Sequence, residues 1–439
     1  MKIRVVPRNL RLRLAAAMLL AAGLTLAEEQ PDTRMTPEEI QAKVDWVNEA
    51  ESGDFQFWRR WRDRPDAAAF RQPQTWYNPM ILVEGGVSQP FFPAAAANEP
   101  ATIDPAAIAA ASGYAMERET QAFMVYHRGK IRHAAFMPGY HEASAISSHS
   151  WVKTLHGILA GFALADGDIE SLDDPVEKYI HEWGGDARGR ITVRQVLHNT
   201  TGLELPFGDF SQAPQPYSKG IQLVEGSDIN ATVLSFELAE EPGTSFAHNN
   251  PNTQLAGMIL QRATGQNFAR YLSEKLWRPM GGQGGAMRLD GFEGNVISYC
   301  CFLSAPADWM RVAHLLMNDG RLPDGARLLP EGWVDEMLAG SAPNPNYGFQ
   351  IWTDAVHMER RPYFPGLPPE FANHHSEPFA TDDLFYLDGG GKVRVWISPG
   401  LDLIVLRMGY PPPPGKGFDE AFIPNTIIRG ILGAADIPE

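Results

Sequence analysis

Apolar residues recur at helical spacing in several stretches of the chain. After Ser150, apolar side chains follow every third or fourth position as far as Leu164, which predicts a long helix that opens near Ser150. Capped or amphipathic stretches predict further helices over 36–50, 104–120, 192–198, 252–264 and 307–318, and from about 421 onward.

Shorter runs rich in β-branched and aromatic residues predict strands near both ends of the chain. Residues 123–126 and 131–136 flank a turn at Arg128-Gly129-Lys130 and predict a hairpin, and residues 392–397 and 402–408 flank the turn at Pro399-Gly400. Strands at the two ends with helices between them predict an α/β (α+β) fold. We expect an antiparallel sheet built from both termini and flanked by helices, with an inserted all-helical subdomain. The pattern shows no internal repeat.

The first residues have the composition of an export signal. Residues 1–27 carry five basic residues and no acid, and residues 14–26 form an apolar run that is short for a membrane span. This predicts a signal peptide over 1–27, a periplasmic or secreted mature protein, and no stable membrane span after cleavage. Residues 28–104 are predicted to be an N-terminal extension and linker, Pro/Ala-rich over 90–105, which leaves 105–430 as the main domain with its helical insert at about 155–330.

Charge narrows the choice of partners. The formal net charge is −16, and removal of the basic residues of 1–27 would leave the chain more acidic still. A chain with this negative charge is repelled by nucleic acid and by anionic membrane surfaces. A small-molecule substrate is therefore expected, and the sequence does not indicate an oligomeric state.

The cysteines and histidines give no sign of a cofactor. Cys300 and Cys301 are adjacent, and a disulfide between neighbours closes a strained ring, so we expect two buried thiols. His374 and His375 are also adjacent and would point apart in a strand, and no zinc-binding motif is present. We expect no metal and no other cofactor.

Ser150 and Lys153 are the most informative pair in the sequence. Residues three apart lie on one face of a helix, so the lysine amine can reach the serine hydroxyl. A desolvated lysine can accept the serine proton, and a helix N-terminus favours the negative charge that develops. The spacing therefore predicts a serine nucleophile with its own base.

The motif and its surroundings resemble the serine β-lactamase and penicillin-binding-protein superfamily. Class C-like esterases and 6-aminohexanoate-dimer hydrolases are the members that the chain resembles most, over roughly residues 105–430. Beyond 150–159, the segments that carry the resemblance are Asp166 to Ile169, Leu172 to Val176 with Tyr179, Ile191 to Leu203, Pro242 to Phe246 with Asn249-Asn250, Ala307 to Arg311, and Leu328 to Pro330.

The resemblance implies a role for each site residue. Ser150 would be the acylated nucleophile, and its backbone N–H would be half of the oxyanion hole. Lys153 would be the proton acceptor, and Asn250 would bind Lys153 or the substrate amide. His248 occupies the position where the family usually has tyrosine. Since the ordinary pKa of histidine is about 6.5, we expect His248 to share the proton relay and to be partly cationic in mildly acidic medium.

The third motif is also irregular. The family carries Lys-Thr-Gly or His-x-Gly on a strand at the site, whereas this chain has the run Leu387 to Val393. We expect the oxyanion and substrate contacts to come from Gly390, Gly391, Lys392 and Val393. Asp388 would lie near the anion-binding position and would repel a substrate carboxylate, which favours neutral or cationic substrates.

These observations predict an exported serine hydrolase that cleaves an ester or an amide through Ser150, with Lys153 and His248 as the proton relay. Two alternatives stay open. One is a β-lactamase or D-amino peptidase of the same mechanism. The other is a catalytically weak ligand-binding protein of the same fold, which the two irregular motifs would suit.

Overall fold

The computed structural model describes residues 57, 59–60, 77–87, 92–206 and 218–433. The predicted signal peptide and the predicted helix over 36–50 lie outside these residues. The other predicted helices are present, with ends that differ by a few residues from those expected.

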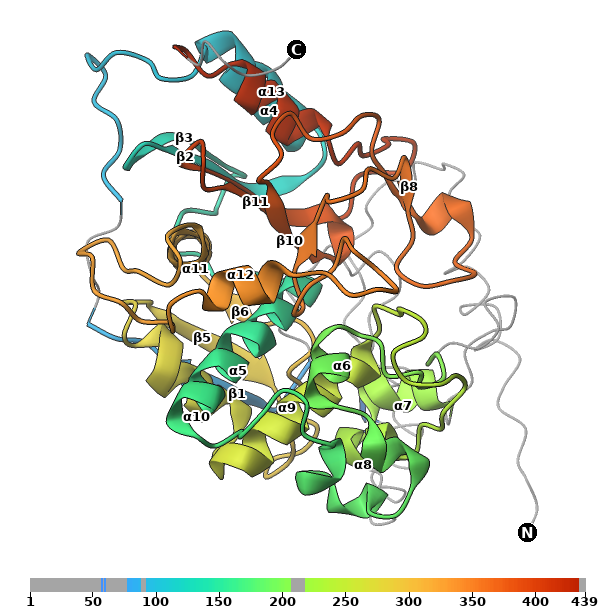
Figure 1. The fold of residues 1–439 in the computed structure, drawn as a ribbon. Helices are drawn as coiled ribbons and strands as arrows, with labels where there is room; N and C mark the ends of the chain where they lie inside the picture. The colour runs from blue at the N-terminus through green and yellow to red at the C-terminus, as the bar shows by residue number, and fades with distance from the viewer. Residues whose placement is uncertain (1–56, 58, 61–76, 88–91, 207–217, 434–439) are drawn as a thin grey trace, which may run out of the picture.

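A six-stranded antiparallel sheet forms the upper half of the molecule in Figure 1, in the order β3-β2-β12-β11-β10-β7. Its first and last strands in the sequence lie side by side at its centre, because β2 pairs with β12. The prediction of one sheet built from both termini is therefore confirmed. The bounds of the strands are Thr120–His127 (β2), Lys130–Phe136 (β3), Trp352–Thr353 (β7), Phe385–Gly389 (β10), Val393–Ser398 (β11) and Leu403–Gly409 (β12).

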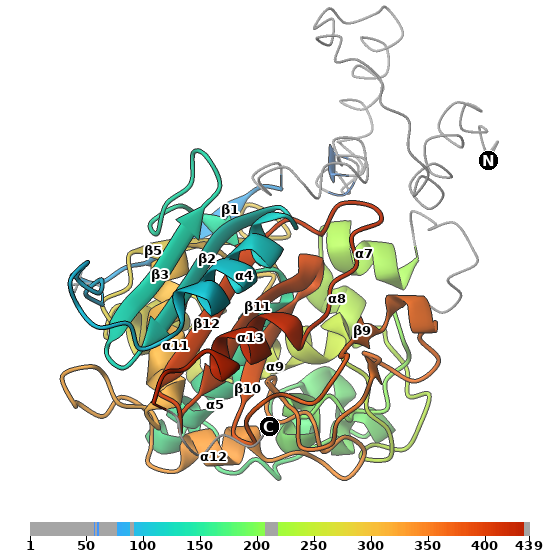
Figure 2. The same cartoon turned by 90° about the horizontal axis from the view of Figure 1, so that it is seen from above.

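Alternate residues of the central strands face two different layers. Phe123 and Val125 pack with helices α4 (Pro105–Met116) and α13 (Phe422–Arg429). Figure 2 shows these two helices side by side across the sheet. Met124 and Tyr126 face the large core on the other side, which includes α11 (Pro306–Met317). The sheet is covered on both faces, which explains why its strands are apolar on both sides.

The helical region lies below the sheet in Figure 1. Its two central helices, α5 (Thr154–Asp166) and α9 (Asn250–Thr264), pack against each other, and α6 (Val193–Leu197) packs on α9. Thr192 and Gln195 form a capping box at the start of α6, as expected for the predicted helix there. The remaining helices are α7 (Lys219–Glu225), α8 (Ile229–Leu234), α10 (Phe268–Leu272) and α12 (Trp333–Leu338).

The inserted region is not entirely helical, which corrects the prediction. It contributes β5 and β6 to a four-stranded sheet in the order β1-β5-β6-β4, whose other two strands precede the insert. The strands β4 (Ile146–Ser147) and β6 (Leu303–Ser304) have two residues each, and β5 (Gly284–Arg288) opens with two glycines, so none shows an alternating pattern. The edge strand β1 (Met80–Glu84) comes from the segment expected to be an extension, and it pairs with β5 along its whole length.

Within the described part of the chain, no helix combines the length and the apolar character that crossing a bilayer requires.

Candidate active site

Ser150 lies in a short 3-10 turn, η3 (His149–Lys153), that runs directly into α5. The predicted helix is thus present, with a tighter first turn than expected. Two backbone hydrogen bonds fix this turn: Ser148 N–H donates to the carbonyl of Phe302 at 2.9 Å, and Cys301 N–H donates to the carbonyl of His149 at 3.0 Å. His149 has a left-handed backbone with φ 48°, a conformation that costs energy for a residue with a side chain and often marks functional turns.

The Lys153 amine lies within reach of three oxygen atoms. Nζ is 3.4 Å from Ser150 Oγ, 2.8 Å from Asn250 Oδ1 and 2.7 Å from the Tyr299 carbonyl. The side chain is 1% exposed. Burial disfavours the ammonium form and lowers the pKa of Lys153 to about 7, although the Asp388 carboxylate acts in the opposite direction. Near neutral pH a large share of the amine is therefore free to accept a proton.

Asn250 is the first residue of α9, so the start of this helix aims it at the lysine. The preceding Asn249 caps the helix by accepting a hydrogen bond from Asn252 N–H at 3.1 Å. The structure thus brings together Ser150, Lys153 and Asn250 from two segments that are about a hundred residues apart.

His248 precedes Asn250 by two residues, lies near enough to Lys153 to feel its charge, and is surrounded by aromatic rings. Its ring centroid is 5.6 Å from Tyr347, 5.7 Å from Trp352 and 5.2 Å from Tyr363, and its backbone N–H donates to the Tyr363 carbonyl at 2.7 Å. Burial, followed by the positive charges of Lys153 and Arg361, holds the pKa of His248 well below its usual value. The expectation of a partly cationic His248 in mildly acidic medium is therefore wrong, because none of the described carboxylates pairs with the ring and the charges of Lys153, Arg361 and Arg394 oppose its protonation.

The third motif forms the end of β10 and a tight turn, η9 (Gly390–Lys392), which pack against η3. The residues beside the nucleophile turn are Gly389 and Gly390. A Cβ added to Gly389 would come within 2.9 Å of the Ser148 carbonyl oxygen, and one added to Gly390 would be 3.8 Å from His149 Nδ1. Only glycine allows this approach at Gly389. Sequence reasoning missed Gly389, since the run of three glycines leaves the register open.

The other three expected residues of this motif point elsewhere. A Cβ on Gly391 would meet Pro411 at 3.4 Å, and Val393 is fully buried in the core. The Lys392 amine binds Asn373 and lies 3.4 Å from Glu420. The side chains of Lys392 and Val393 are thus engaged with other residues, whereas Gly390 lies beside η3, and a backbone donor between Gly391 and Val393 stays a prediction.

Asp388 is buried and fully paired, which corrects its expected role. Its carboxylate binds Arg361, accepts a hydrogen bond from the Tyr363 hydroxyl at 2.9 Å, and lies 2.7 Å from Arg394. A carboxylate held by two guanidinium groups presents no net negative charge, so Asp388 would not repel a substrate carboxylate. Arg361 and Tyr363 come from the stretch around β8 (Arg360–Arg361), and no local pattern in the sequence marks them as site residues.

Cys300 and Cys301 form a disulfide, which corrects the expectation of two thiols. Contacts on both sides of the pair hold the backbone in place, and this is a factor beyond the strain of the small ring. The Tyr299 carbonyl binds the Lys153 amine, and Cys301, with φ 70°, binds the carbonyl of His149. The pair is therefore next to the candidate site.

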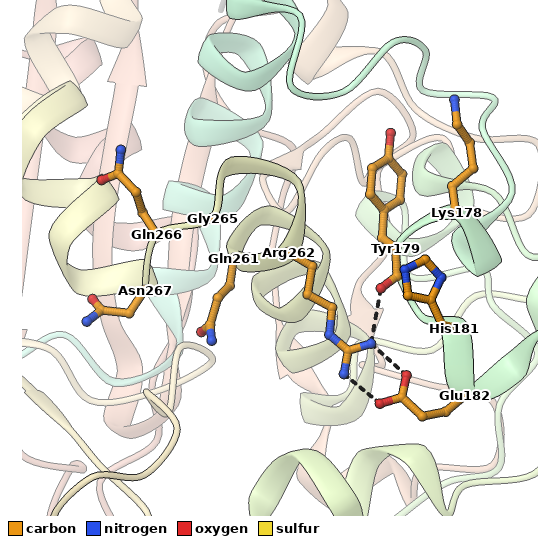
Figure 3. A pocket seen from close by; sticks show the side chains of 9 residues that line it. All are labelled: Lys178, Tyr179, His181, Glu182, Gln261, Arg262, Gly265, Gln266 and Asn267. Atoms are coloured by element: carbon orange, nitrogen blue, oxygen red, sulfur yellow. Dashed lines mark hydrogen bonds and ion pairs between the residues drawn. The ribbon is translucent and has the colours of Figure 1, made fainter.

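A hollow of about 790 Å³ opens on the surface between the end of α9 and the loop at 178–182, away from the candidate active site (Figure 3). Its main charges pair with each other: Arg262 binds both carboxylate oxygens of Glu182 and donates to the Tyr179 carbonyl at 3.0 Å. None of the residues that line it belongs to the candidate active site. Among the described residues, no group of three or more potential metal ligands lies close enough together to hold an ion.

Comparisons with known proteins relate this part of the chain to a described family. Residues 108–294, which include Ser150, Lys153, His248 and Asn250, match the family model described as Beta-lactamase. Protein flp of Staphylococcus aureus (strain COL) is 28% identical over 125 residues, which cover 28% of this chain and 24% of that protein. The chain thus matches about a quarter of the length of this curated relative.

A longer match comes from the 6-aminohexanoate-dimer hydrolase of Paenarthrobacter ureafaciens. It is 24% identical over 234 residues, which cover 51% of this chain and 58% of that protein. Among solved structures, a candidate 6-aminohexanoate-dimer hydrolase from Bacillus anthracis is similar with a TM-score of 0.63 and 18% identity, covering 84% of this chain and 94% of that one. The fold is therefore the β-lactamase/transpeptidase-like fold that the sequence predicted.

Proposed function

We propose that this chain, a serine hydrolase of the β-lactamase and penicillin-binding-protein-like family, cleaves a small-molecule ester or amide through an acyl-enzyme on Ser150. The observation that supports this most is the buried amine of Lys153, 3.4 Å from Ser150 Oγ. A lysine whose pKa is lowered to about 7 can act as a base at neutral pH, and a purely structural lysine has no need of that property.

The proposed reaction has two halves. Lys153 accepts the Ser150 proton as Oγ attacks the substrate carbonyl carbon, and the resulting ammonium returns a proton to the leaving alcohol or amine. A water molecule then attacks the acyl-enzyme and gives a proton to Lys153. The product acid leaves, and the proton returns to Ser150 Oγ. Asn250 holds the amine in place through both halves.

Backbone groups would stabilise the tetrahedral intermediate. The N–H of Ser150 lies at the start of η3 and α5, where a helix N-terminus favours negative charge. The second donor would come from the backbone at Gly389 or Gly390, which lies against the same turn. Donors held in place before the reaction starts are the main source of this stabilisation.

His248 would serve as a neutral member of the relay. The neutral imidazole can accept a proton at one nitrogen and donate one from the other, so it can pass a proton between Lys153 and the leaving group. Packing of the His248 ring against the tilted ring of Tyr363 would hold the imidazole in one orientation.

Residues 1–27 support the further proposal that the enzyme is exported, with periplasm or medium as its site of action. The name of the Paenarthrobacter relative makes an amide substrate plausible. A β-lactamase or D-amino peptidase is a second candidate, favoured by one observation: two arginines neutralise Asp388, so the site does not reject a carboxylate on charge grounds.

A substrate panel tests these proposals. The mature protein and Ser150→Ala are assayed with p-nitrophenyl esters, p-nitroanilides and a chromogenic cephalosporin. Ester or anilide hydrolysis that disappears in Ser150→Ala supports the main proposal, and cephalosporin turnover that exceeds both supports the second candidate. No turnover of any substrate by folded protein would contradict both and favour the ligand-binding alternative.

A further inference from the structure

Two buried arginines lie directly opposite each other behind the third motif. Arg394 of β11 and Arg407 of β12 are cross-strand partners, and the exposed fraction of each is 0%. Like charges at opposite positions destabilise a sheet, and burial removes the water that would screen them. An apolar pair at this position would make the sheet more stable, as at the neighbouring pair Val395 and Leu406. Two buried like charges opposite each other, in a sheet that borders an active site, point to a functional reason for keeping them.

The arginines bind the carbonyl groups of the third motif. Nη1 of Arg394 donates to Gly389 at 2.8 Å and to Val393 at 2.7 Å. Nη1 of Arg407 donates to Gly391 at 3.0 Å and to Lys392 at 2.7 Å. Four of the five carbonyl groups between Gly389 and Val393 are therefore held by guanidinium groups.

The two arginines differ in how their charge is balanced. Arg394 makes paired contacts to Glu420 at 2.6 and 2.7 Å and also lies 2.7 Å from Asp388. The hydrogen bonds of Arg407, by contrast, all go to backbone carbonyls, including those of Arg118 and Tyr410. Burial and the neighbouring Arg394 cation lower the pKa of Arg407 to about 9. The charge of Arg407 is thus held chiefly by peptide dipoles of the turn.

The turn from Gly389 to Val393, whose carbonyl groups the arginines bind, also packs against the nucleophile turn η3. A Cβ on Gly389 would come within 2.9 Å of the Ser148 carbonyl oxygen, and β10 and η9 both pack against η3. In a trans peptide the C=O and N–H groups point in opposite directions, so a carbonyl held in place also fixes the direction of the N–H in the same unit. A cation on the carbonyl oxygen also polarises that unit and makes its N–H a stronger donor.

We infer that Arg394 and Arg407 are positioning residues for oxyanion binding. Arg394 directs the Gly390 N–H, which shares a peptide unit with the Gly389 carbonyl, and Arg407 fixes the rest of the turn through the Gly391 and Lys392 carbonyls. Neither side chain touches the substrate. They hold the turn rigid and direct its N–H groups before the substrate arrives, which is the preorganisation that oxyanion stabilisation requires. This inference rests on the proposed function of Ser150 as a nucleophile.

Arg407 is the better residue for a test. Loss of Arg394 would leave Asp388 and Glu420 with less neutralisation and would destabilise the sheet, whereas Arg407 forms no ion pair with any described carboxylate. In Arg407→Met the side chain keeps much of its length and loses the cation, and in Arg407→Lys the cation stays but one nitrogen replaces the two that now bind four carbonyls. Arg311→Met serves as the control, since Arg311 is a buried arginine of α11 whose ion-pair partner is Asp308, outside the proposed site.

The measurement is the ratio of kcat/KM for a p-nitrophenyl ester to that for the matching thionoester. A thionoester develops charge on sulfur, which fits an oxyanion site poorly, so this ratio reports oxyanion stabilisation. A merely structural loss lowers the amount of active enzyme and cancels in the ratio. We expect the ratio to fall about tenfold in Arg407→Met, less than the 10²–10³-fold in kcat that loss of a whole donor costs, and to fall less in Arg407→Lys. It should be unchanged in Arg311→Met.

The outcomes separate the two proposals. A parent protein that hydrolyses neither substrate would contradict the proposed function, and this inference with it. If the parent hydrolyses the ester and the ratio of the two kcat/KM values is unchanged in Arg407→Met, this inference is overturned. The proposed function would then still stand.

Discussion

The amine of Lys153 lies 2.8 Å from Asn250 Oδ1, closer than its 3.4 Å distance to Ser150 Oγ. In this arrangement the asparagine holds the amine while the serine hydroxyl lies at the long end of hydrogen-bonding range, a distance that can shorten when substrate binds. The carbonyl of Tyr299 completes the contacts of the amine. These acceptors favour the ammonium form and burial opposes it; burial has the larger effect, so the pKa of Lys153 falls to about 7.

The first prediction concerns the pH dependence of kcat/KM. The base must be unprotonated to act, so kcat/KM should rise with pH through about 7, the pKa of Lys153, and level off above it. Since the pKa of His248 lies well below its usual value, His248→Gln should lower the maximum kcat/KM without shifting the pH at which kcat/KM rises. Stopped-flow or steady-state ester hydrolysis from pH 5 to 9 measures both. A limb that moves with His248→Gln would assign it to the histidine.

The second prediction concerns stability. A pKa of about 7, against an ordinary value of 10.5, means that the buried ammonium destabilises the folded state at pH below 7, and that this cost fades as pH rises toward 10.5. Lys153→Met should therefore be inactive yet more stable at pH 6, by on the order of 2 kcal/mol after the loss of the hydrogen bonds to Asn250 and Tyr299. The gain should shrink at pH 9.5.

Urea unfolding at both pH values measures this gain, with Lys416→Met as an exposed control that should show neither effect. A Lys153→Met protein that is less stable than the parent at pH 6 would show that the ammonium is not the costly form.

The third prediction concerns the close approach of β10 to the nucleophile turn. In Gly389→Ala the new methyl group would lie 2.9 Å from the Ser148 carbonyl oxygen and 3.1 Å from His149 Cβ, so strand and turn must separate. Displacements of this kind at a reacting centre cost about 10²-fold in rate, and we expect kcat to fall by at least tenfold. In Gly417→Ala the added carbon has no neighbour within 4 Å, so activity should stay at the parent level. Equal activity of Gly389→Ala and Gly417→Ala would show that the third motif is not part of the active site.

The fourth prediction concerns the charge behind the site. The Asp388 carboxylate raises the pKa of Lys153 against the effect of burial. Asp388→Asn should therefore move the limb of the pH profile below its parent position, because one negative charge near the ammonium is lost. It should also lower the melting temperature, since Arg361 and Arg394 lose their shared partner, a break that costs about 3–5 kcal/mol for a buried pair. A limb that moves upward would contradict the electrostatic assignment.

The sequence predicted those parts of the site that depend on local spacing. Ser150 and Lys153 are three residues apart in one turn, so their proximity follows from spacing over a few residues, whereas Asn250 was expected at the site through the family resemblance. The two-ended sheet also followed, because β11, β12 and the β2–β3 hairpin each carry strong strand signals. The burial that tunes Lys153 could not be read in the same way, since it depends on how the helices pack on the sheet.

The remaining parts depend on contacts between residues that are distant in sequence. Asp388 was misread because its partner Arg361 lies 27 residues earlier, on a two-residue strand that leaves no pattern. The opposition of Arg394 and Arg407 depends on the register of β11 and β12, which a single sequence does not fix. The pairing of β1 with β5 joins segments about two hundred residues apart, and short, glycine-rich strands gave no signal for it.

The central claim, that Ser150 is a nucleophile activated by Lys153, is tested most directly by covalent labelling. The mature protein, Ser150→Ala and Lys153→Ala are incubated with a fluorophosphonate probe and analysed by intact mass, with circular dichroism to confirm folding. We predict one adduct on the parent, none on Ser150→Ala, and labelling of Lys153→Ala that is slower by at least 10²-fold. Folded parent protein that takes up no probe, or equal labelling of the parent and Ser150→Ala, would contradict the claim.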